Sequence, residues 1–569
     1  MMPLPNLLAT RWGRLSAFFL LYITEGIPLG FAATAVATQL RRQGVGPAEI
    51  GAFVASFYLP WAFKWAAGPL VDVFRSKRWG HRRGWILGTQ LMLSLTILML
   101  IPVPLPQALW LFTIILLVHN SFGAIQDVAI DSLAVNTLGE DERGLANGLM
   151  FAGASIGQGV GGSGVLYLMD FGLPFQATFV FVSLSILAVT AFVVLPMREA
   201  LSDAMASIGT GWRAAGSEMK KFAVESFRSF VGTKGAFLGV FFSLMPAGAM
   251  SLGLALQSNL SVELGMTDGE VADLNLWSII ISALAMVLGG WLSDKWGRRR
   301  TLAVYLLGMS LPVVYLMVVL YQHHYIMPRA PNSPPIPELI TVLWIASLTY
   351  AVFQGLMYGT RSAIMMDVTN PAVAATQFTA YMAMMNLAIA IAATWQGIAI
   401  EAWGYPMTLL VDAITGPACV LLLPWMKRKS EGFTDALAEG RARKTAWVLG
   451  VLCVLWLPYW AVRDEFGAAQ PIMATFYTLV FIASALFLLA GREVLKQAAG
   501  LWHRAALWAA LLLFAMYARN WLDKLKDSPL FAVANALVYL APLAGGIVLL
   551  ALAGRNWHAV GIEKEPQPA

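Results

Sequence analysis

The sequence predicts an all-α polytopic membrane protein in which two six-helix halves are followed by about four extra transmembrane helices. Of its 569 residues, 58% are hydrophobic and only 12% are charged, against roughly 25% charged in ordinary soluble domains. Apolar runs of about 18 to 28 residues, long enough to cross a bilayer as helices, recur along the chain. A short polar motif also occurs twice, at corresponding places in two successive sets of six runs, which indicates an internal repeat.

Sixteen apolar runs can be placed in chain order. They lie at 14–40, 47–73, 84–103, 108–136, 145–168, 174–196, 235–260, 270–293, 301–321, 339–367, 373–399, 404–426, 445–462, 471–490, 502–518 and 529–553. We expect a first bundle, a cytoplasmic linker with an amphipathic helix, a second bundle, a second cytoplasmic linker, a four-helix membrane appendix and a cytoplasmic tail. Their respective bounds are 1–196, 197–234, 235–427, 428–444, 445–556 and 557–569.

The distribution of cations predicts the orientation, because Lys and Arg in short loops are retained in the cytoplasm. With the amino terminus inside, twenty-nine of the 38 Lys and Arg residues fall on the cytoplasmic side and seven on the other. Lys64 and Arg361 fall within runs. We therefore expect both termini in the cytoplasm. The residues that fit this orientation least are Arg519, Lys524 and Lys526, which it places outside.

The clearer copy of the repeated motif lies at 290–300, between two apolar runs. We expect Gly290 to let two helices approach closely, while an aspartate ends the run and a cationic cluster fills the turn beyond. Parallel six-helix halves facing each other across a cavity are a transporter architecture. In such an architecture the motif would hold cytoplasmic gates, with aspartates pairing with loop arginines and helix N-termini. The candidate gating residues of the two copies are Asp72, Arg82, Arg83, Asp294, Arg298 and Arg299.

Ionisable residues inside the first half are candidate proton-coupling groups, because such a group is costly in a membrane unless it is paired or hydrated. Glu25 in run one and Lys64 in run two are natural partners, whether for coupling or only for structure. Gly26 and Pro28 flank Glu25, and Pro28 removes a backbone donor, so we expect the helix to break there.

Run four adds Gln126, Asp127 and Asp131. The two aspartates are four residues apart and so share one helical face. Two like charges in a low dielectric favour the binding of a proton. The candidate proton-coupling residues are thus Glu25, Lys64, Asp127 and Asp131, although Asp131 would also suit helix packing. His119, in the same run, suits either a proton relay or an ordinary interior position.

The runs of the second half are lined by amides and aromatic rings, which suit a sugar-peptide or another large polar ligand. Gln354, Tyr358 and Arg361 recur at spacings of four and three, so they share a face. An arginine there suits a carboxylate or phosphate; alternatively it pairs with Asp367 or another carboxylate. The candidate substrate-binding residues are Gln126, Gln257, Asn259, Gln354, Tyr358, Arg361, Gln377 and Tyr381.

Other features predict packing rather than chemistry. Six glycines between 153 and 164 permit close helix crossing, and we expect a packing and rocking surface there. Cys419 and Cys453 lie in apolar runs and predict no disulfide. His323 and His324 lack further ligands, so we expect no metal and no cofactor. The net charge of +6 reflects cytoplasmic loops rather than a nucleic-acid surface.

Several motifs resemble one family of transporters. They are Ile27-Pro28-Leu29-Gly30, Phe63-Lys64, Gly68-Pro69-Leu70-Val71-Asp72, Gly80-His81-Arg82-Arg83-Gly84-Trp85, Gln126-Asp127-Val128-Ala129-Ile130-Asp131, Glu142-Arg143-Gly144 and Ala375-Thr376-Gln377-Phe378. Together they resemble the AmpG-type muropeptide permeases and the related acetyl-CoA transporters, in the peptide/acetyl-CoA group of the major facilitator superfamily. The resemblance covers about 14–427 and stops before the last four runs. The motif at 126–131 is typical of that group, whereas the loop around Asp294 marks only the superfamily. The first loop departs from the superfamily pattern by an insertion at 73–77.

The resemblance implies the major facilitator fold and a function. It implies proton-driven import of anhydromuropeptides (GlcNAc-anhydroMurNAc-peptides) from periplasm to cytoplasm across a bacterial inner membrane, in cell-wall recycling and β-lactamase induction. The alternative cargoes are an acyl-CoA, a siderophore or a small peptide. A membrane enzyme acting on lipid-linked substrates is disfavoured, because the sequence has no clustered catalytic set, metal-ligand spacing or nucleophile elbow. A sensor with a transporter fold remains a further alternative.

Overall fold

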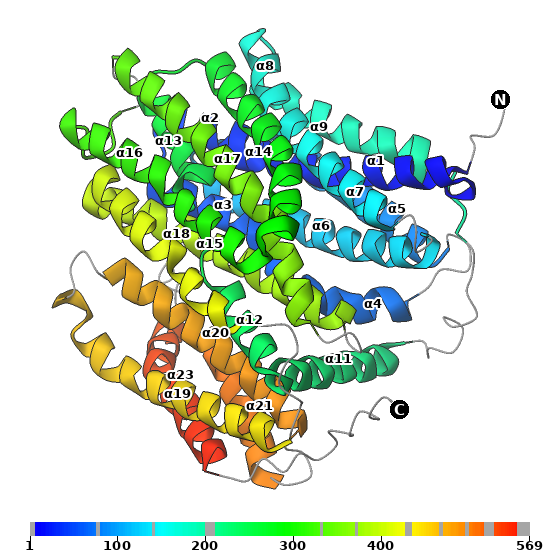
Figure 1. Cartoon of the computed structure of the whole chain (residues 1–569), viewed down its shortest axis with the longest axis vertical. Helices are drawn as coiled ribbons and strands as arrows, with labels where there is room; N and C mark the ends of the chain where they lie inside the picture. Colours follow the sequence, from blue (N-terminus) through cyan, green and yellow to red (C-terminus); the bar gives the residue numbers. More distant parts are fainter. Residues whose placement is uncertain are drawn as a thin grey trace. The chain divides into compact units, whose positions relative to one another are not determined.

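The computed structural model describes residues 6–74, 80–138, 143–199, 211–330, 334–369, 374–426, 435–465, 470–494, 500–516 and 529–554. The regular elements in these ranges are helices (Figure 1). Nine of the described helices are long and apolar enough to cross a membrane, and three more are apolar but shorter. The prediction of an all-α polytopic membrane protein is confirmed.

The helices follow the predicted runs. The first half, residues 6–199, contains η1 (Leu7–Ala9), α1 (Arg11–Gly30), η2 (Phe31–Val36), α2 (Ala37–Arg42), α3 (Pro47–Ala62), η3 (Lys64–Ala67), α4 (Gly68–Val73), α5 (Arg82–Met99), α6 (Leu109–Thr137), α7 (Arg143–Gly159), η4 (Val160–Gly164), α8 (Val165–Asp170), α9 (Phe175–Val189) and η5 (Thr190–Val194). The linker helix is α11 (Trp212–Gly232). The second half, residues 234–426, contains α12 (Lys234–Leu244), η6 (Ser251–Gly253), α13 (Ala255–Glu263), α14 (Asp268–Trp296), α15 (Arg298–Gly308), α16 (Ser310–Gln322), α17 (Pro337–Val368), α18 (Ala374–Thr415) and η8 (Gly416–Trp425). The appendix contains α19 (Asp435–Ala461), α20 (Gln470–Val494), α21 (Gly500–Ala515) and α23 (Pro529–Ala553).

Two local predictions differ from the structure. Pro28 does not break the first helix, because α1 continues to Gly30 and then widens into the π-helical η2. A π turn leaves backbone groups free to shift partners without ending the helix. The appendix begins earlier than expected, since α19 starts at Asp435 inside the predicted linker. Arg519, Lys524 and Lys526 lie outside the described residues.

The chain divides into two compact units. The first consists of Met1–Gly216, Met245–Ile364 and Met382–Leu423, and the second of Ser217–Leu244, Met365–Tyr381 and Pro424–Ala569. Within the second unit, α19, α20, α21 and α23 pack around an aromatic core that includes Trp456, Tyr459, Tyr477 and Phe481. Arg441 on α19 donates to the carbonyl oxygens of Val231 and Gly232, at 2.7 and 2.8 Å. These two carbonyls end the linker helix α11, so Arg441 caps it.

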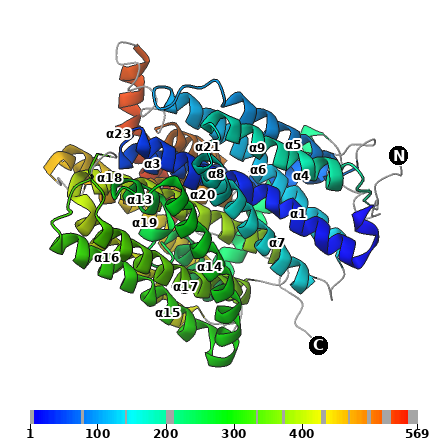
Figure 2. The same cartoon turned by 90° about the horizontal axis from the view of Figure 1, so that it is seen from above.

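Helix α1 packs against α7 and η4 backbone to backbone within the first unit (Figure 2). A Cβ added to Gly161 would lie 1.9 Å from the Ile27 carbonyl oxygen, and one added to Gly30 would lie 2.1 Å from that of Gln158. Side chains would force the two helices apart. The prediction that the glycines of run five permit close packing is therefore confirmed.

The close approach expected at Gly290 occurs one residue earlier. A Cβ on Gly289 would lie 2.4 Å from the Leu356 carbonyl oxygen on α17, whereas one on Gly290 would meet nothing within 4 Å. Neighbouring residues on a helix point about 100° apart, so only one of two adjacent glycines can face the partner helix. The motif therefore contributes its packing through Gly289.

The second half contains two interruptions that bring polar groups inside. Run seven is broken between α12 and α13. The Asp412 carboxylate accepts hydrogen bonds there from the Met250 and Ser251 amides, both at 2.8 Å, and from the Ser251 hydroxyl at 2.6 Å. The second interruption divides α18 at Gly404, which has a φ of 79°. A side chain there would meet the Ile326 carbonyl oxygen, so only glycine fits.

Candidate functional site

The acidic and basic residues predicted in the first half form one cluster between α1, η3 and α6. Lys64 Nζ lies 2.6 Å from Asp127 Oδ2, and both side chains are largely buried. The Tyr22 hydroxyl donates to Asp131 Oδ1 at 2.5 Å. Glu25 interacts electrostatically with both aspartates and with the lysine and is in side-chain contact with Asp127, while its buried Oε1 has no hydrogen-bond partner among the described residues. The structure therefore brings all four candidate proton-coupling residues together.

The predicted pairing of Lys64 with Glu25 is wrong, because the lysine pairs with Asp127. Helix α3 ends at Ala62 and Lys64 begins a 3-10 turn, so the helical period of run two no longer sets its direction. The cluster has three carboxylates and one ammonium group. Fully ionised, it would carry an excess of two negative charges in a low dielectric, which is costly unless a proton or another cation binds.

Gln126 lies next to this cluster but faces the interior of the first half. Its Nε2 donates to Thr24 Oγ1 at 3.0 Å, and Gln90 donates to the same hydroxyl oxygen at 3.2 Å. Gln126 is fully buried, and its Oε1 has no partner among the described residues. His119 is also buried; its Nδ1 lies 2.8 Å from Thr96 Oγ1, as in an ordinary interior histidine.

In the second half, Arg361 is the buried cation. It is 6% exposed, its guanidinium lies 5.0 Å from the ring centroid of Tyr358, and its Nε has no hydrogen-bond partner in the part of the chain that the structure describes. Among the described residues, no carboxylate lies within ion-pairing distance of it. A buried guanidinium left in this way carries a desolvation cost that an anion would relieve.

The other predicted substrate-binding residues fall into two groups. Gln354 lies on α17 beside the broken segment of run seven, since its Nε2 is the nearest atom to a Cβ added at Gly253. Asn259, on α13, is buried with an unpartnered Oδ1, and Gln257 on the same helix is half-buried. These three belong to the first unit, as Arg361 does.

Gln377 and Tyr381 belong to the second unit. The Gln377 amide donates to the Tyr381 hydroxyl at 3.0 Å, and that hydroxyl donates to the Ala236 carbonyl oxygen at 2.8 Å. Both side chains are fully buried. Within this unit they join the start of α18 to α12.

The candidate gating residues are only partly described. The side chains of Asp72 and Asp294 lie outside the described residues. Arg82 Nε donates to the Ser132 hydroxyl at 2.8 Å, and Arg83 Nε donates to the Val194 carbonyl oxygen at 3.0 Å, so both hold the first half together. Arg298 is partly exposed and Arg299 exposed at the start of α15.

Sequence analysis missed three buried charged residues. Asp412 is a single aspartate in an otherwise apolar run, and this position in the sequence could have indicated a buried polar site. Arg41 and Glu263 lie at the ends of their runs and so count as loop charges in a hydropathy reading. In the structure they form a buried ion pair with an N–O distance of 2.6 Å.

Comparisons with known proteins agree with this architecture. The family model of the Major Facilitator Superfamily matches residues 15–247 and 236–562. The Anhydromuropeptide permease of Escherichia coli K12 is 24% identical over 458 residues, covering 78% of this chain and 85% of the relative. The Putative transporter AmpG 4 of Rickettsia felis is 25% identical over 433 residues, covering 73% and 97%.

Solved structures share the fold. The xylose transporter XylE from E. coli, in a partially occluded inward open conformation, has a TM-score of 0.55 at 14% identity, covering 74% of this chain and 99% of that one. The nucleoside transporter NupG, in a mutant form, has a TM-score of 0.52 at 14% identity, covering 73% and 99%. The matched family segments span most of the chain, which is therefore a secondary transporter that belongs to the major facilitator superfamily.

Proposed function

We propose that this protein is a proton-coupled symporter that imports anhydromuropeptides from the periplasm to the cytoplasm by alternating access, in cell-wall recycling and β-lactamase induction. The observation that carries the proposal is the buried, unpaired guanidinium of Arg361 in the second half. It suits a carboxylate-bearing cargo, and the names of the relatives supply the class of cargo. The resemblance implies a bacterial inner membrane, and the predicted orientation would place both termini in the cytoplasm.

In this proposal Arg361 binds a carboxylate of the peptide stem. Its fork of N–H donors matches the two oxygens of a carboxylate, and the Tyr358 ring supports the guanidinium. Gln354 and Asn259, with their amide groups, would bind the hydroxyl and amide groups of the sugar-peptide. Gln126 and Gln257, in the same unit as Arg361, would support the binding surface rather than face it directly.

The proton would be carried by the cluster in the first half. Lys64 already neutralises Asp127, and Tyr22 already donates to Asp131. Among the described residues, Glu25 Oε1 is a buried carboxyl oxygen of this cluster that has no donor, so a neutral Glu25 costs least in this arrangement. We therefore assign the transported proton to Glu25, with Asp127 and Asp131 setting its affinity.

Uptake into proteoliposomes tests the cargo. The purified protein is reconstituted and given a labelled anhydromuropeptide with an inwardly directed proton gradient, and unlabelled acyl-CoA, siderophore or dipeptide is added as competitor. We expect gradient-driven uptake that only muropeptide fragments inhibit. Inhibition by one of the other compounds, with no inhibition by muropeptide fragments, would assign the transporter to that cargo instead.

Three variants test the assigned roles. Arg361→Gln should abolish saturable uptake, whereas Arg361→Lys should keep part of it, because the charge remains but the fork is lost. Glu25→Gln should lose its dependence on the proton gradient, because it removes the group assigned to carry the proton. Asp464→Asn, at an exposed site of the appendix, is the matched control. Full uptake with unchanged gradient dependence in Glu25→Gln would overturn that assignment.

A further inference from the structure

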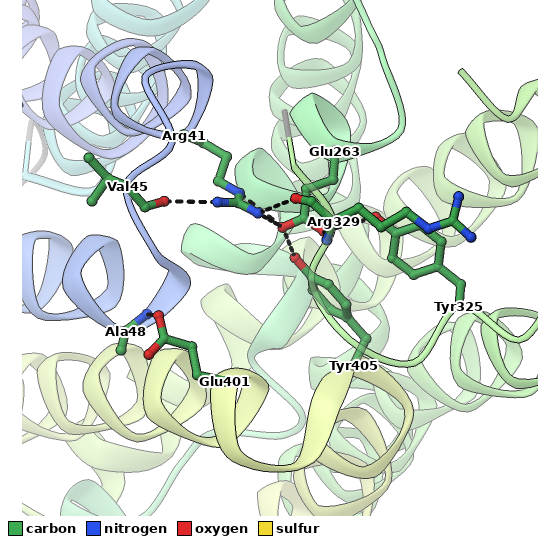
Figure 3. A network of polar contacts seen from close by, with 8 residues as sticks. All are labelled: Arg41, Val45, Ala48, Glu263, Tyr325, Arg329, Glu401 and Tyr405. Carbon is green, nitrogen blue, oxygen red and sulfur yellow. Dashed lines mark hydrogen bonds and ion pairs between the residues drawn. The ribbon is translucent and has the colours of Figure 1, made fainter. Parts of the chain in front are cut away.

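A buried ion pair joins the two halves at one end of the first unit. Arg41, on α2, donates through Nε and Nη2 to Glu263 Oε1 on α13, at 2.9 and 2.6 Å (Figure 3). The Arg41 side chain is 5% exposed and that of Glu263 is 0% exposed. Breaking a buried pair by removing one partner is strongly destabilising, because the other charge is left without compensation. The contact is therefore a strong one as long as this end stays dry.

The second half surrounds Glu263 with further donors. The Tyr405 hydroxyl donates to Oε1 at 2.7 Å, the Tyr325 hydroxyl to Oε2 at 2.8 Å, and the Arg329 amide to Oε2 at 3.0 Å. We call Glu263, Tyr325, Tyr405 and the Arg329 amide the Glu263 cradle. Burial, together with the Glu263 charge, raises the pKa of Tyr325, which lies in the loop after α16. Its hydroxyl therefore remains a donor throughout the physiological pH range.

The cradle is held as one piece. The Tyr405 amide donates to the Ile326 carbonyl oxygen at 2.8 Å, which ties the loop after α16 to the break in α18. The positive φ of Gly404 allows this approach. The Arg329 guanidinium also lies 4.6 Å from the ring centroid of Tyr325. The parts of the cradle would therefore stay together in any movement of the second half.

Arg41 has far less support from its own half. There its Nη1 donates to the Val45 carbonyl oxygen at 2.9 Å, while its Nη2 also reaches the Arg329 carbonyl oxygen at 2.6 Å in the second half. If the halves separate, Glu263 keeps three donors and Arg41 keeps one acceptor. Both charges would then be hydrated. The Arg41–Glu263 pair can therefore break without leaving the Glu263 carboxylate buried and uncompensated.

Other contacts at this end support the same closure. Arg42 Nε lies 2.6 Å from Asp268 Oδ1, and the Ala48 amide donates to Glu401 Oε1 at 2.9 Å. Each joins the first half to the second. The Arg42 pair is more exposed than the Arg41 pair, so it forms a hydrated rim around a dry centre.

We propose that Arg41 and the Glu263 cradle form the outer latch of the transporter, that is, the contact between the two halves that closes its outer end. When this end opens, Arg41 moves away with the first half, and the cradle stays intact in the second half as the fixed receptor. The predicted orientation places this end outside, where cargo would enter, so the latch must break before each loading event. This inference rests on the proposed function. It differs from the predicted cytoplasmic gates in its residues and in the side of the membrane.

The cradle makes the latch asymmetric, so that the two charges cannot exchange places as they could in an ordinary ion pair. Position 263 faces two hydroxyl donors and one amide donor. An arginine placed there would face the Arg329 amide with no acceptor to offer, and both hydroxyls would have to turn to accept from it. A glutamate at position 41 would face the Val45 and Arg329 carbonyl oxygens, which are acceptors as well. The charge-swapped double variant, Arg41→Glu with Glu263→Arg, should therefore fail to close the latch, although its net charge is unchanged.

Distances between spin labels at this end test the latch. Labels are attached at Phe171→Cys in the first half and Tyr321→Cys in the second, both exposed positions, after the buried Cys419 and Cys453 are replaced by alanine. Arg41→Ala should shift the ratio of open to closed populations by about ten-fold or more, because a buried pair is lost. Glu263→Gln, which keeps the side-chain shape, should shift it in the same direction. Arg463→Ala, whose contacts lie on its own helix and the next turn, is the matched control and should leave the distances unchanged.

The outcomes separate the latch from the proposed function. An unchanged distance distribution in both Arg41→Ala and Glu263→Gln would overturn the latch, whatever the uptake results. Closure restored by the charge swap would overturn the fixed-receptor role of the cradle. If the distances shift as expected while the wild-type protein takes up no muropeptide, the latch stands and the assignment of the cargo falls.

Discussion

Two adjacent glycines on α14 should respond to the same substitution with opposite changes in stability. Gly289 and Gly290 both lie inside this helix, where replacing glycine by alanine normally stabilises by about 0.5–1 kcal/mol through backbone entropy. Gly290 has no neighbour within 4 Å of an added Cβ. Gly290→Ala should therefore be neutral or stabilising by that amount.

Gly289→Ala should instead destabilise. Its Cβ would lie 2.4 Å from the Leu356 carbonyl oxygen and 2.6 Å from the Leu356 Cα. Backbone atoms cannot rotate away as a side chain does, so α14 and α17 must separate by about 1 Å to reach ordinary van der Waals contact. Overpacking of this kind costs about 1–3 kcal/mol, which exceeds the entropic gain. The two variants should differ by about 2–4 kcal/mol.

Unfolding in detergent at a fixed scan rate measures this difference. A common scan rate is needed because membrane proteins of this size often unfold irreversibly. The apparent melting temperature should fall for Gly289→Ala and should stay constant or rise for Gly290→Ala. Equal shifts of the same sign in the two variants would refute the assignment of the close approach to Gly289.

Three further substitutions follow from single contacts. Asp412→Ala removes the acceptor of several buried donors and should destabilise by about 3 kcal/mol or more in the same assay, whereas the exposed Asp464→Ala should not. Lys64→Met should destabilise the protein by about 3–5 kcal/mol, because it leaves Asp127 buried without its cation. Adding Asp127→Asn to this variant should recover most of the lost stability. If stability did not recover, Lys64 and Asp127 would not be energetically coupled. Arg441→Ala should increase amide hydrogen exchange at the end of α11, and unchanged exchange would show that the cap contributes nothing.

The fold could be predicted because membrane burial leaves a strong local signal. Apolar runs set the helices, and the glycines of run five showed where backbones approach. Pro28 misled the prediction, since its effect depends on whether neighbouring turns can widen, as η2 does. The choice between Gly289 and Gly290 depends on the rotation of α14 about its axis. The stretch 274–292 has no charged residue, so the sequence there does not specify that rotation.

The candidate site could be predicted as a set of residues but not as a set of pairs. Composition alone showed that Glu25, Lys64 and Asp127 are costly in a membrane. Which carboxylate receives the lysine depends on the 3-10 turn that begins at Lys64, and no periodicity shows it. Arg41 and Glu263 are separated by 222 residues. Because each ends an apolar run, their burial depends wholly on how the halves meet.

The opposite charges of the two halves lead, on the proposed function, to a testable linkage between proton and cargo. The cluster around Glu25 would repel an anion bound at Arg361, and each proton that binds the cluster reduces that repulsion. At an effective dielectric of about 20 and an assumed separation of about 10 Å, two unit charges interact by about 1.7 kcal/mol, which is more than ten-fold in affinity. Cargo should therefore bind about ten-fold more tightly at mildly acidic than at mildly alkaline pH. Bound cargo must raise proton affinity by the same factor.

Equilibrium binding of labelled muropeptide to the purified protein measures this linkage. Glu25→Gln removes the titrating group while keeping its shape, so it should bind cargo with nearly the same affinity at both pH values. Since the proposal assigns the proton to Glu25, that affinity should match the wild type at acidic pH. Glu338→Gln, at an exposed site, is the matched control and should retain the wild-type pH dependence. If Glu25→Gln also retained the wild-type pH dependence of cargo binding, the proton that assists binding would have to reside on another carboxyl group. Asp131, which lies beside the same lysine–aspartate pair, would then be the next residue to substitute.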